Sequence, residues 1–443
     1  MCARWLIPGE HSCRSTEASR QWNPKLTALV AGGIFFPQRG RLGLGSRELT
    51  PGLVAKIVFA GAESRSEKRA QIVMEKVGDC QISVKTIERV LHDVGAELAD
   101  LRDCPPSRVP KSLVPPPPAG PPQLAVVMYD GGRMMTRQPG HGPGVHEQAW
   151  RETKNASLES RTHELHNQDP HPDLPACFAD PRHVAEIAGT APLPVPSPSP
   201  SDPPEESPPK RSQRLVRTCL SSLAKTKSFG LQMQREAWRR SLHKAPYKAF
   251  VGDGLPANWA IWKKHFRDFE PILDFMHAVE YVYAAAIVMY EQDAQAGWVC
   301  YLHWAGLCWS GQVQQVLPEL VAWLEDRGLK LGETLDEKHP HKAVHDAHRY
   351  LNNNISRMDY ARYREQGLPV TSAPMESLVK QMNLRVKGTE MFWNDSTKGG
   401  EAILQIRSAA LSDDGRLDTY LTRRPGCPFV RRTSPKAYKR LNS

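Results

Sequence analysis

Residues 246–286 read PYKAFVGDGLPANWAIWKKHFRDFEPILDFMHAVEYVYAAA. Two short apolar runs, 249–251 and 272–273, predict buried strands, and an acid follows each run, Asp253 and Asp274. In α/β sheets, ligands and catalytic groups collect at the C-terminal ends of strands, because the loops there can vary without disturbing the buried strand. The stretch therefore predicts an α/β fold with acidic side chains at one edge of its sheet.

The composition is that of a globular protein with long polar segments. The 443 residues allow two or three domains, and 40% of them are apolar, which is enough for a large core. The sequence has no apolar run of about 18 residues and begins without the apolar segment of a signal peptide, so we expect no membrane span and a cytoplasmic location. The nine cysteines include no C-x-x-C pair, which argues against a structural zinc site and a secreted disulfide framework.

The net charge of +10 is unevenly distributed. Between Arg423 and Arg440 the sequence has seven basic residues and no acid. A solvated tail and a tail that contacts phosphate groups explain this run equally well. Residues 423–443 are therefore assigned as a basic tail, and charge alone supports a polyanionic partner only weakly.

Residues 50–104 carry the pattern of a small helical region. Apolar side chains recur at helical spacing in its second half, and Ser83 is a suitable N-cap for that helix. A glycine-aspartate turn between two such helices predicts a helix-turn-helix DNA-binding region, with Lys85 and Arg89 on its exposed face. A helical hairpin used for dimerisation is an equally good interpretation.

Proline-rich segments divide the chain. Nine prolines within residues 105–122 predict a semi-rigid linker, the clearest domain boundary. Nine more lie within residues 192–209, in an irregular loop of about residues 160–240. Residues 211–245 look helical and basic, whereas residues 1–49 show no clear period and stay unassigned.

Residues 123–290 read as the first part of the core. The apolar run 124–129 predicts a strand that ends at Asp130, and a second strand at 134–137 would complete a hairpin with the acid at its turn. Residues 150–158 read as a third short strand.

The sequence after Asp274 is helical. Helical periods cover residues 277–290, 313–325 and 341–354, with Trp298, Trp304, Trp309 and Trp323 between and within them. Tryptophans at this density are typical of a packed helical subdomain, which we prefer to base stacking on DNA. Residues 291–366 are assigned as a helical insertion and residues 367–422 as the second part of the core, where Glu376 lies in the first turn of a helix whose dipole favours an acid.

Asp130, Asp253 and Glu376 would form a metal site if the fold brought them together. Two carboxylates about 4 Å apart repel by about 4 kcal/mol at an effective dielectric constant near 20, so a convergent trio needs cations. Carboxylate oxygens suit Mg²⁺ or Mn²⁺, and two such ions support in-line phosphodiester cleavage. Simpler interpretations exist: Asp130 and Asp253 as turn residues, Glu376 as a first-turn acid. Asp274 also fits as the N-cap of the next helix.

Six segments form a specific set when they are taken in order. They are VVMYDGGR (126–133), WRETKNASL (150–158), FVGDG (250–254), ILDFMHAVEY (272–281), YLNNN (350–354) with RMDY (357–360), and GLPVTSAPMES (367–377) with RVKGTEMFW (385–393). The set resembles the insertion-sequence transposases of the ISKra group and related bacterial elements, and the resemblance covers roughly residues 50–410.

The resemblance implies a ribonuclease-H-like catalytic domain that is interrupted by an all-helical insertion and preceded by the helix-turn-helix. It implies that Asp130, Asp253 and Glu376 hold two Mg²⁺ or Mn²⁺ ions. It also implies that Asp274 and His277 form the D-x-x-H motif that supports the active site of such transposases.

The implied activity is that of a DNA transposase, which cleaves transposon ends and transfers the strand into target DNA. The implied partner is double-stranded DNA, both terminal inverted repeats and target, bound by a homodimer or larger assembly in the bacterial cytoplasm and at the nucleoid. Further candidate DNA contacts are Arg133, Arg137, Lys380, Arg385 and Lys387. Glu401 competes for the third acid position, but the helix-start context of Glu376 fits the family better. An inactive or domesticated sequence-specific DNA-binding protein is the alternative, and a nuclease that cuts without joining is a weaker one.

Overall fold

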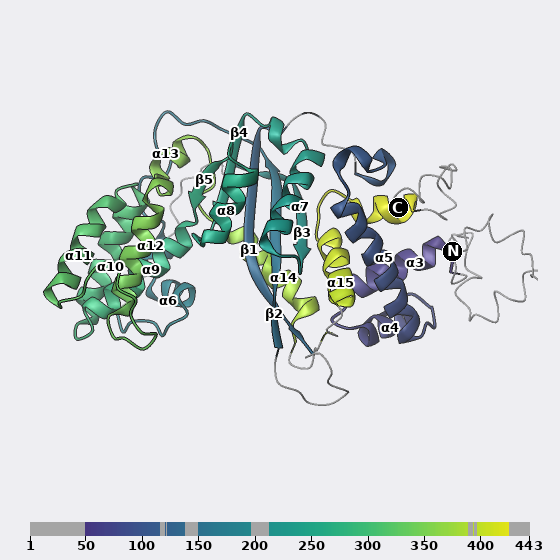
Figure 1. Ribbon diagram of the computed structural model, residues 1–443, viewed down its shortest axis with the longest axis horizontal. Coiled ribbons are helices and arrows are strands. Elements are labelled where there is room, and N and C mark those ends of the chain that lie inside the picture. The colour runs from purple at the N-terminus through teal and green to yellow at the C-terminus, as the bar shows by residue number, and fades with distance from the viewer. Residues whose placement is uncertain are drawn as a thin grey trace, which may run out of the picture.

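The computed structural model describes residues 49–115, 120, 122–137, 149–195, 212–388, 393 and 397–424. Nearly all of the unassigned N-terminal segment and of the basic tail lies outside the described residues. Figure 1 shows a central sheet between a group of helices on one side and the N-terminal helices on the other. In the described part of the chain, no helix is long and apolar enough to cross a membrane.

The strands of the described residues form one mixed sheet in the order β3-β2-β1-β4-β5. They are β1 (Leu124–Thr136), β2 (Ala149–Arg161), β3 (Arg214–Ser222), β4 (Tyr247–Gly252) and β5 (Glu270–Leu273). β1, β2 and β3 pair antiparallel, whereas β4 runs parallel to β1 and β5 parallel to β4. The predicted α/β class is confirmed; β4 ends at Gly252, whereas the parallel strand β1 continues past their last paired residues to Thr136, so that Asp130 lies within β1.

β1 is one long strand that does not turn at Gly131 and Gly132. Both glycines stay in register with β2, opposite Lys154 and Thr153, so the predicted hairpin is wrong. A Cβ on Gly132 would lie 2.6 Å from the Thr153 hydroxyl oxygen. Glycine inside a strand often marks such a close approach, and that need explains the pair better than a turn does.

The α-helices of the described residues are α3 (Pro51–Glu63), α4 (Glu67–Lys76), α5 (Val84–Asp103), α6 (Pro181–Ala188), α7 (Thr226–Arg239), α8 (Pro256–His265), α9 (Phe275–Met289), α10 (Ala294–Trp309), α11 (Val316–Asp326), α12 (Lys342–Asn354), α13 (Tyr360–Glu365), α14 (Ala373–Val386), α15 (Thr397–Ala410) and α16 (Arg416–Arg423). Short 3₁₀ helices lie at Pro106–Arg108, Lys111–Leu113, Ala176–Ala179, Leu242–Lys244, Val313–Gln315 and Ile355–Arg357.

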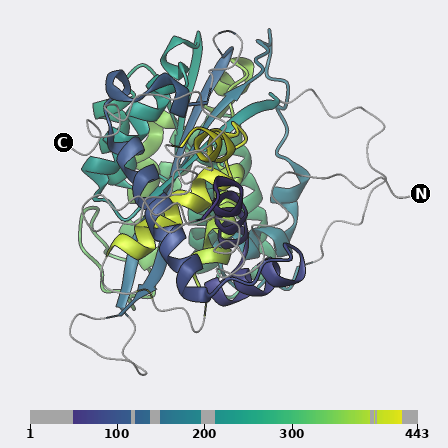
Figure 2. The same ribbon diagram turned by 90° about the vertical axis from the view of Figure 1, so that its right-hand side faces the viewer.

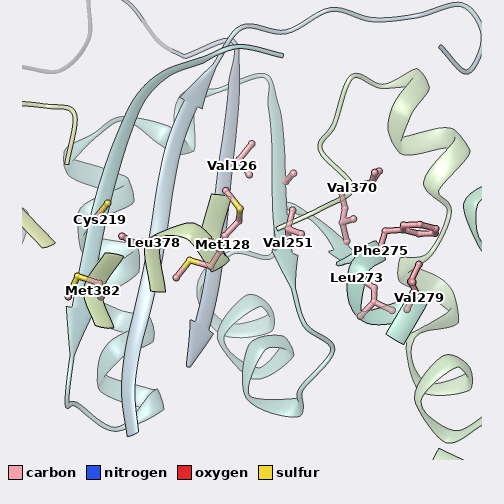
Figure 3. Packing of buried hydrophobic residues seen from close by; sticks show 14 of the residues in the cluster. Val126, Met128, Cys219, Val251, Leu273, Phe275, Val279, Val370, Leu378 and Met382 are labelled. Atoms are coloured by element: carbon pink, nitrogen blue, oxygen red, sulfur yellow. The ribbon is translucent and has the colours of Figure 1, made fainter. Parts of the chain in front are cut away.

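Alternate side chains of β1 build the two faces of the sheet, as the two-residue period of a strand requires. On one face, Val126 and Met128 share a buried cluster with Leu378 and Met382 of α14 (Figure 3). On the other face, the alternate β1 residues Ala125, Val127 and Tyr129 pack against α7 and α8. The sheet is therefore buried on both faces, with α14 and α15 on one side and α7 and α8 on the other.

The segment predicted as an irregular loop of about residues 160–240 contains regular structure. After β2 it holds α6, β3 and α7 among its described residues. Residues 211–245, predicted to be helical throughout, begin instead with β3, whose second half is buried against β2. Only from Thr226 does the chain become the basic helix that the sequence indicates.

The N-terminal helices α3, α4 and α5 share their core with the rest of the molecule. Ser83 caps α5 as predicted, and its side chain accepts a hydrogen bond from the Thr86 N–H. α5 crosses α15 so closely that a Cβ on Gly95 would overlap the backbone of Ala402. Figure 2 shows these helices in front of the sheet. They form an outer layer of one body and have no separate core of their own.

We call α6 and α9–α13 the helical body. Residues 275–365, all of them described, contain these last five helices and no strand. The segment between β2 and β3 joins them through hydrogen bonds that include those from the Tyr301 hydroxyl to Phe178 O and from Trp309 Nε1 to His171 O, both 2.8 Å long. Trp298, Trp304 and Trp309 are buried, as expected for tryptophans that pack between helices, and the assignment of residues 291–366 as an inserted domain stays a prediction. Trp323 is partly buried beneath the Arg327 guanidinium.

Candidate active site

Asp130 within β1 and Asp253 directly after β4 lie at matched distances from the last paired residues of these two parallel strands. The register of β1 with β4 ends at Met128 opposite Val251, and each acid follows two residues later. Neighbouring strands lie about 4.8 Å apart, so residues at matched positions are close in space. The register of the sheet therefore brings together two acids that are far apart in the sequence.

Backbone and amide donors orient both acids. Asp130 Oδ1 accepts a 2.6 Å hydrogen bond from the Gly131 N–H. Asp253 Oδ1 accepts from the Leu255 N–H at 2.9 Å and from Asn258 Nδ2 at 2.5 Å. Among the described residues, neither acid has a hydrogen-bond donor to its Oδ2 atom. Each carboxylate thus has one oxygen fixed by the protein and a second oxygen free to meet a ligand.

Asp274 is fully buried and connects the sheet to two helices. It is the N-cap of α9, accepting from the Met276 N–H at 3.2 Å, and its Oδ2 lies 2.9 Å from His277 Nδ1. It also accepts from the Ser372 N–H at 3.0 Å and from the Ser372 hydroxyl at 2.5 Å. Ser372 precedes α14, so Asp274 fixes the start of the helix that carries Glu376.

Glu376 lies in the first turn of α14, as predicted. Its carboxylate is partly exposed and makes a 3.8 Å ion pair with the more exposed Lys380. A further acid that the sequence analysis did not single out, Glu280, lies on α9 one turn after His277. The pKa of Glu280 is raised by burial and by the charge of Glu376, so the starts of α9 and α14 face the same site.

We call Asp130, Asp253 and Glu376 the sheet-edge group, because two of them lie where the pairing of β1 with β4 ends. The charges of these acids act on one another. Burial first, then the charge of Asp253, with a smaller part from Glu376, raises the pKa of Asp130 to about 6. Burial also raises the pKa of Asp253. Burial lowers the pKa of His277, but the hydrogen bond and charge of Asp274 and the charge of Asp253 outweigh it and raise that pKa to about 9. The site is therefore a negatively charged cluster with one imidazolium beside it at neutral pH.

No protein-family model matches the sequence, and the search of curated proteins gives no match. Among the solved structures that resemble this chain is a Drosophila P element transposase strand transfer complex. The sequence identity is 11% and the TM-score 0.33, over 83% of this chain and 93% of that one. A TM-score this low is a weak likeness and supports no conclusion about activity. The ISKra group that the sequence resembles stays a prediction.

The chemistry of the donor set fits a hard divalent cation. Asp130, Asp253 and Glu376 offer carboxylate oxygens, and Asp130 and Asp253 each keep one oxygen without a hydrogen-bond donor. A cation would also relieve the repulsion that raises the pKa of Asp130. Across the described ranges, however, no three His, Cys, Asp or Glu side chains already lie as a group that could hold a metal ion. The ligand set is thus chemically suitable without being preassembled.

Glu401, the competing third acid, lies elsewhere. In α15 its Oε1 accepts from Arg102 Nη1 of α5 at 2.5 Å and from the Ser222 hydroxyl at 2.8 Å. Its Oε2 accepts from the Leu223 N–H at 2.7 Å. Both oxygens are therefore engaged in a contact between α5, α15 and the end of β3, and Glu376 is the acid whose charge acts on Asp130.

The predicted DNA contacts divide into exposed and buried side chains. Those that are exposed are Lys85, Arg89, Arg133, Lys380 and Lys387. Arg137 is half-buried, and its N–H donates to Trp393 O. Arg385 is a correction, because it is 2% exposed and donates to Gly61 O at 2.9 Å and to Glu67 at 2.7 Å. Arg385 joins α14 to the N-terminal helices and is not available to a phosphate.

Sequence reasoning missed Ser372 and Asn258, which orient Asp274 and Asp253. A serine directly before the Ala-Pro start of a helix is a recognisable N-terminal signal. Its hydroxyl, however, donates to Asp274 instead of capping its own helix. Asn258 has no local signal, since its partner is defined only once α8 packs beside the loop after β4.

Proposed function

We propose that this protein is a DNA transposase that cleaves DNA at transposon ends in a metal-dependent reaction and transfers the freed strand into target DNA. The observation that carries the proposal is that Asp130 and Asp253 follow the last paired residues of β1 and β4 by two positions each, and that burial, the charge of Asp253 and a smaller effect of Glu376 raise the pKa of Asp130 to about 6. The ordered set of segments that resembles the ISKra group supports the same function. The mixed sheet, with β4 and β5 parallel to β1, is compatible with a ribonuclease-H-like core, and in this proposal α9–α13 would be the helical insertion.

Each residue of the site has a distinct part in the proposal. Asp130, Asp253 and Glu376 would hold two Mg²⁺ or Mn²⁺ ions, which when bound supply activation of the attacking oxygen and stabilisation of the leaving one. His277, cationic at neutral pH, limits the repulsion between Asp130 and Asp253 in the free protein. Asp274 holds both His277 and the start of α14, and so positions Glu376.

The proposed partner is double-stranded DNA. Lys85 and Arg89 at the start of α5 are exposed and would read or hold the transposon end through the turn between α4 and α5. Arg133 of β1, Lys380 of α14 and Lys387 just after α14 are exposed, and in this proposal they would contact phosphates. Because strand transfer joins two transposon ends to one target, we propose an assembly of at least two copies.

The decisive experiment measures cleavage of a labelled terminal-repeat duplex and nicking of supercoiled plasmid, each with Mg²⁺ or Mn²⁺. Asp130→Asn, Asp253→Asn and Glu376→Gln should each lower the cleavage rate at least about 1000-fold while DNA affinity changes by less than about twofold. Glu401→Gln is the matched control and should retain cleavage. Cleavage at the wild-type rate by any of the three variants would remove that residue from the site.

A second candidate is a DNA-binding protein without catalytic activity. The observation in its favour is that the described acids are not gathered into a ready metal site. Both candidates predict affinity that falls steeply with salt, by a slope of about −0.9 for each phosphate contact in B-DNA on a logarithmic scale. Metal-dependent nicking separates them, since a pure binder bends or occupies DNA without breaking it.

A further inference from the structure

The helical body touches the Asp253 loop at a point that the proposed mechanism does not yet use. Tyr350 of α12 donates a 2.7 Å hydrogen bond from its hydroxyl to the carbonyl oxygen of Asp253. The next residue, Gly254, has φ +86°, and a Cβ there would lie 2.7 Å from the Tyr350 ring. Only glycine combines this left-handed backbone with so close an approach. The loop thus lies directly on a side chain of the helical body.

A second contact lies one turn further along α12. Asn354, 2% exposed, accepts a 2.9 Å hydrogen bond from Trp259 Nε1 of α8. The Arg357 guanidinium covers the same indole ring, 4.5 Å from its centroid. α8 begins three residues after Asp253, and its Asn258 donates to Asp253 Oδ1. α12 therefore holds the loop directly through Tyr350 and indirectly through α8.

Tyr350 is itself held in place. Its ring stacks on Tyr281 of α9, with centroids 3.8 Å apart and an interplanar angle of 13°. α9 also carries His277 at its first turn. Asn354 Nδ2 donates to the Tyr350 carbonyl at 2.9 Å, which links the two contact points within α12. The hydroxyl of Tyr350 is thus placed by packing on two helices and does not depend on the loop that it contacts.

We propose that Tyr350 and Asn354 are positioning residues, through which docking of the helical body on the sheet sets the orientation of the Asp253 carboxylate. The contact at the carbonyl fixes the backbone of residue 253, and the contact at Trp259 fixes the helix whose Asn258 holds Oδ1. The catalytic consequence rests on the proposed function, whereas the mechanical link between α12 and the loop does not. A body outside the sheet would in this way control a residue of the active site.

The link is tested in the full-length protein without metal or DNA, by hydrogen exchange of the backbone amides of residues 252–258. Tyr350→Phe removes only the hydroxyl and should increase their exchange about fivefold, the change expected for one lost hydrogen bond. Trp259→Phe should act in the same direction if the first variant proves unstable. Tyr360→Phe is the control, because within the described structure the buried Tyr360 hydroxyl has no hydrogen-bond partner. Unchanged exchange in Tyr350→Phe and Trp259→Phe would overturn the link.

The catalytic consequence is tested by the dependence of plasmid nicking on Mg²⁺ concentration. Tyr350→Phe should raise the half-saturating Mg²⁺ concentration at least about threefold and lower the maximal rate, with DNA affinity unchanged and Tyr360→Phe like wild type. Faster exchange with unaltered Mg²⁺ dependence and rate would overturn the positioning role. If the wild-type protein does not nick at all, the proposed function fails, and the exchange result still decides the link by itself.

Discussion

Two groups of carboxylates in this molecule, one half-buried and one buried, have opposite surroundings. At the sheet edge, burial raises the pKa of Asp130 and of Asp253, and no arginine pairs with either within the described residues. Between α7 and α16, Glu236 and Asp414 lie 2.7 and 2.6 Å from Arg416. Burial acts against ionisation there too, yet the guanidinium holds the pKa of both carboxyls below their ordinary values.

The difference separates acids that hold the fold together from acids kept for chemistry. A buried carboxylate with a bidentate or shared arginine is neutralised by the chain and needs nothing more. Carboxylates left uncompensated raise the free energy of the folded state, and a fold keeps them where a ligand or reaction uses them. We therefore infer that the sheet-edge group is the functional one and the Arg416 group is structural.

The largest expected effect is on the structural group. Arg416→Met removes the cation that Glu236 and Asp414 share and leaves each with a single arginine, Arg239 at 3.1 Å and Arg240 at 3.8 Å. We expect a loss of about 3 kcal/mol in the free energy of unfolding, measured by urea denaturation at pH 7. Arg423→Met, on the exposed side of the same helix, is the control and should change stability by less than about 0.5 kcal/mol. A loss below about 1 kcal/mol for Arg416→Met would break the comparison.

An effect of opposite sign is expected at the sheet edge. The folded-state pKa of Asp130 is raised from 3.8 to about 6. Its ionisation therefore lowers the free energy of unfolding, and this loss develops as the pH rises from about 4 to 6. Asp130→Asn should therefore stabilise the protein by about 2 kcal/mol at pH 8 and by little at pH 4.

Asp414→Asn is the matched variant for that measurement. Its folded-state pKa is lowered, so it contributes stability above pH 4 that is lost as the pH falls through the folded value. It should therefore destabilise the protein at pH 8. Denaturation curves of the two variants at pH 4 and pH 8 should move in opposite directions, and a shared direction would show that both acids are structural.

The smallest expected effect is metal-dependent stabilisation. Mg²⁺ at ten times its dissociation constant should add about 1.4 kcal/mol to the stability of the wild-type protein, seen as a rise in melting temperature. NaCl at the same ionic strength controls for screening. Asp253→Asn should abolish the rise in melting temperature. Glu401→Gln should keep it, because Glu401 already accepts hydrogen bonds from Arg102 and Ser222. Equal shifts with Mg²⁺ and Na⁺ would mean that the acids hold no cation.

Local patterns predicted those features that depend on neighbours along the chain. The α/β class, β4 and the N-cap Ser83 follow from apolar period and capping chemistry over a few residues. The placement of Glu376 in a first turn follows from the proline and apolar spacing after it.

Features fixed by distant partners could not be read in this way. Gly131 and Gly132 look like a turn, and only their register with β2 shows a strand. Arg385 looks like a phosphate contact, but its acceptor Glu67 lies 318 positions earlier. No local sequence pattern predicts a contact between residues so far apart in the chain. The sequence favours Glu376 over Glu401 only by its context at a helix start, and the hydrogen bond that Arg102 donates to Glu401 could not be read from local sequence.

Because α5 and α15 cross closely at Gly95 and Ala402, the N-terminal helices are packed rigidly on the rest of the molecule. If α4 and α5 recognise the transposon end, their recognition surface cannot be exchanged between relatives as a portable module. A change on the buried side of α5 would have to be matched on α15, which packs on β3. The preference for a DNA sequence and the packing of α15 on the sheet would then change together in evolution, by paired substitutions where α5 crosses α15.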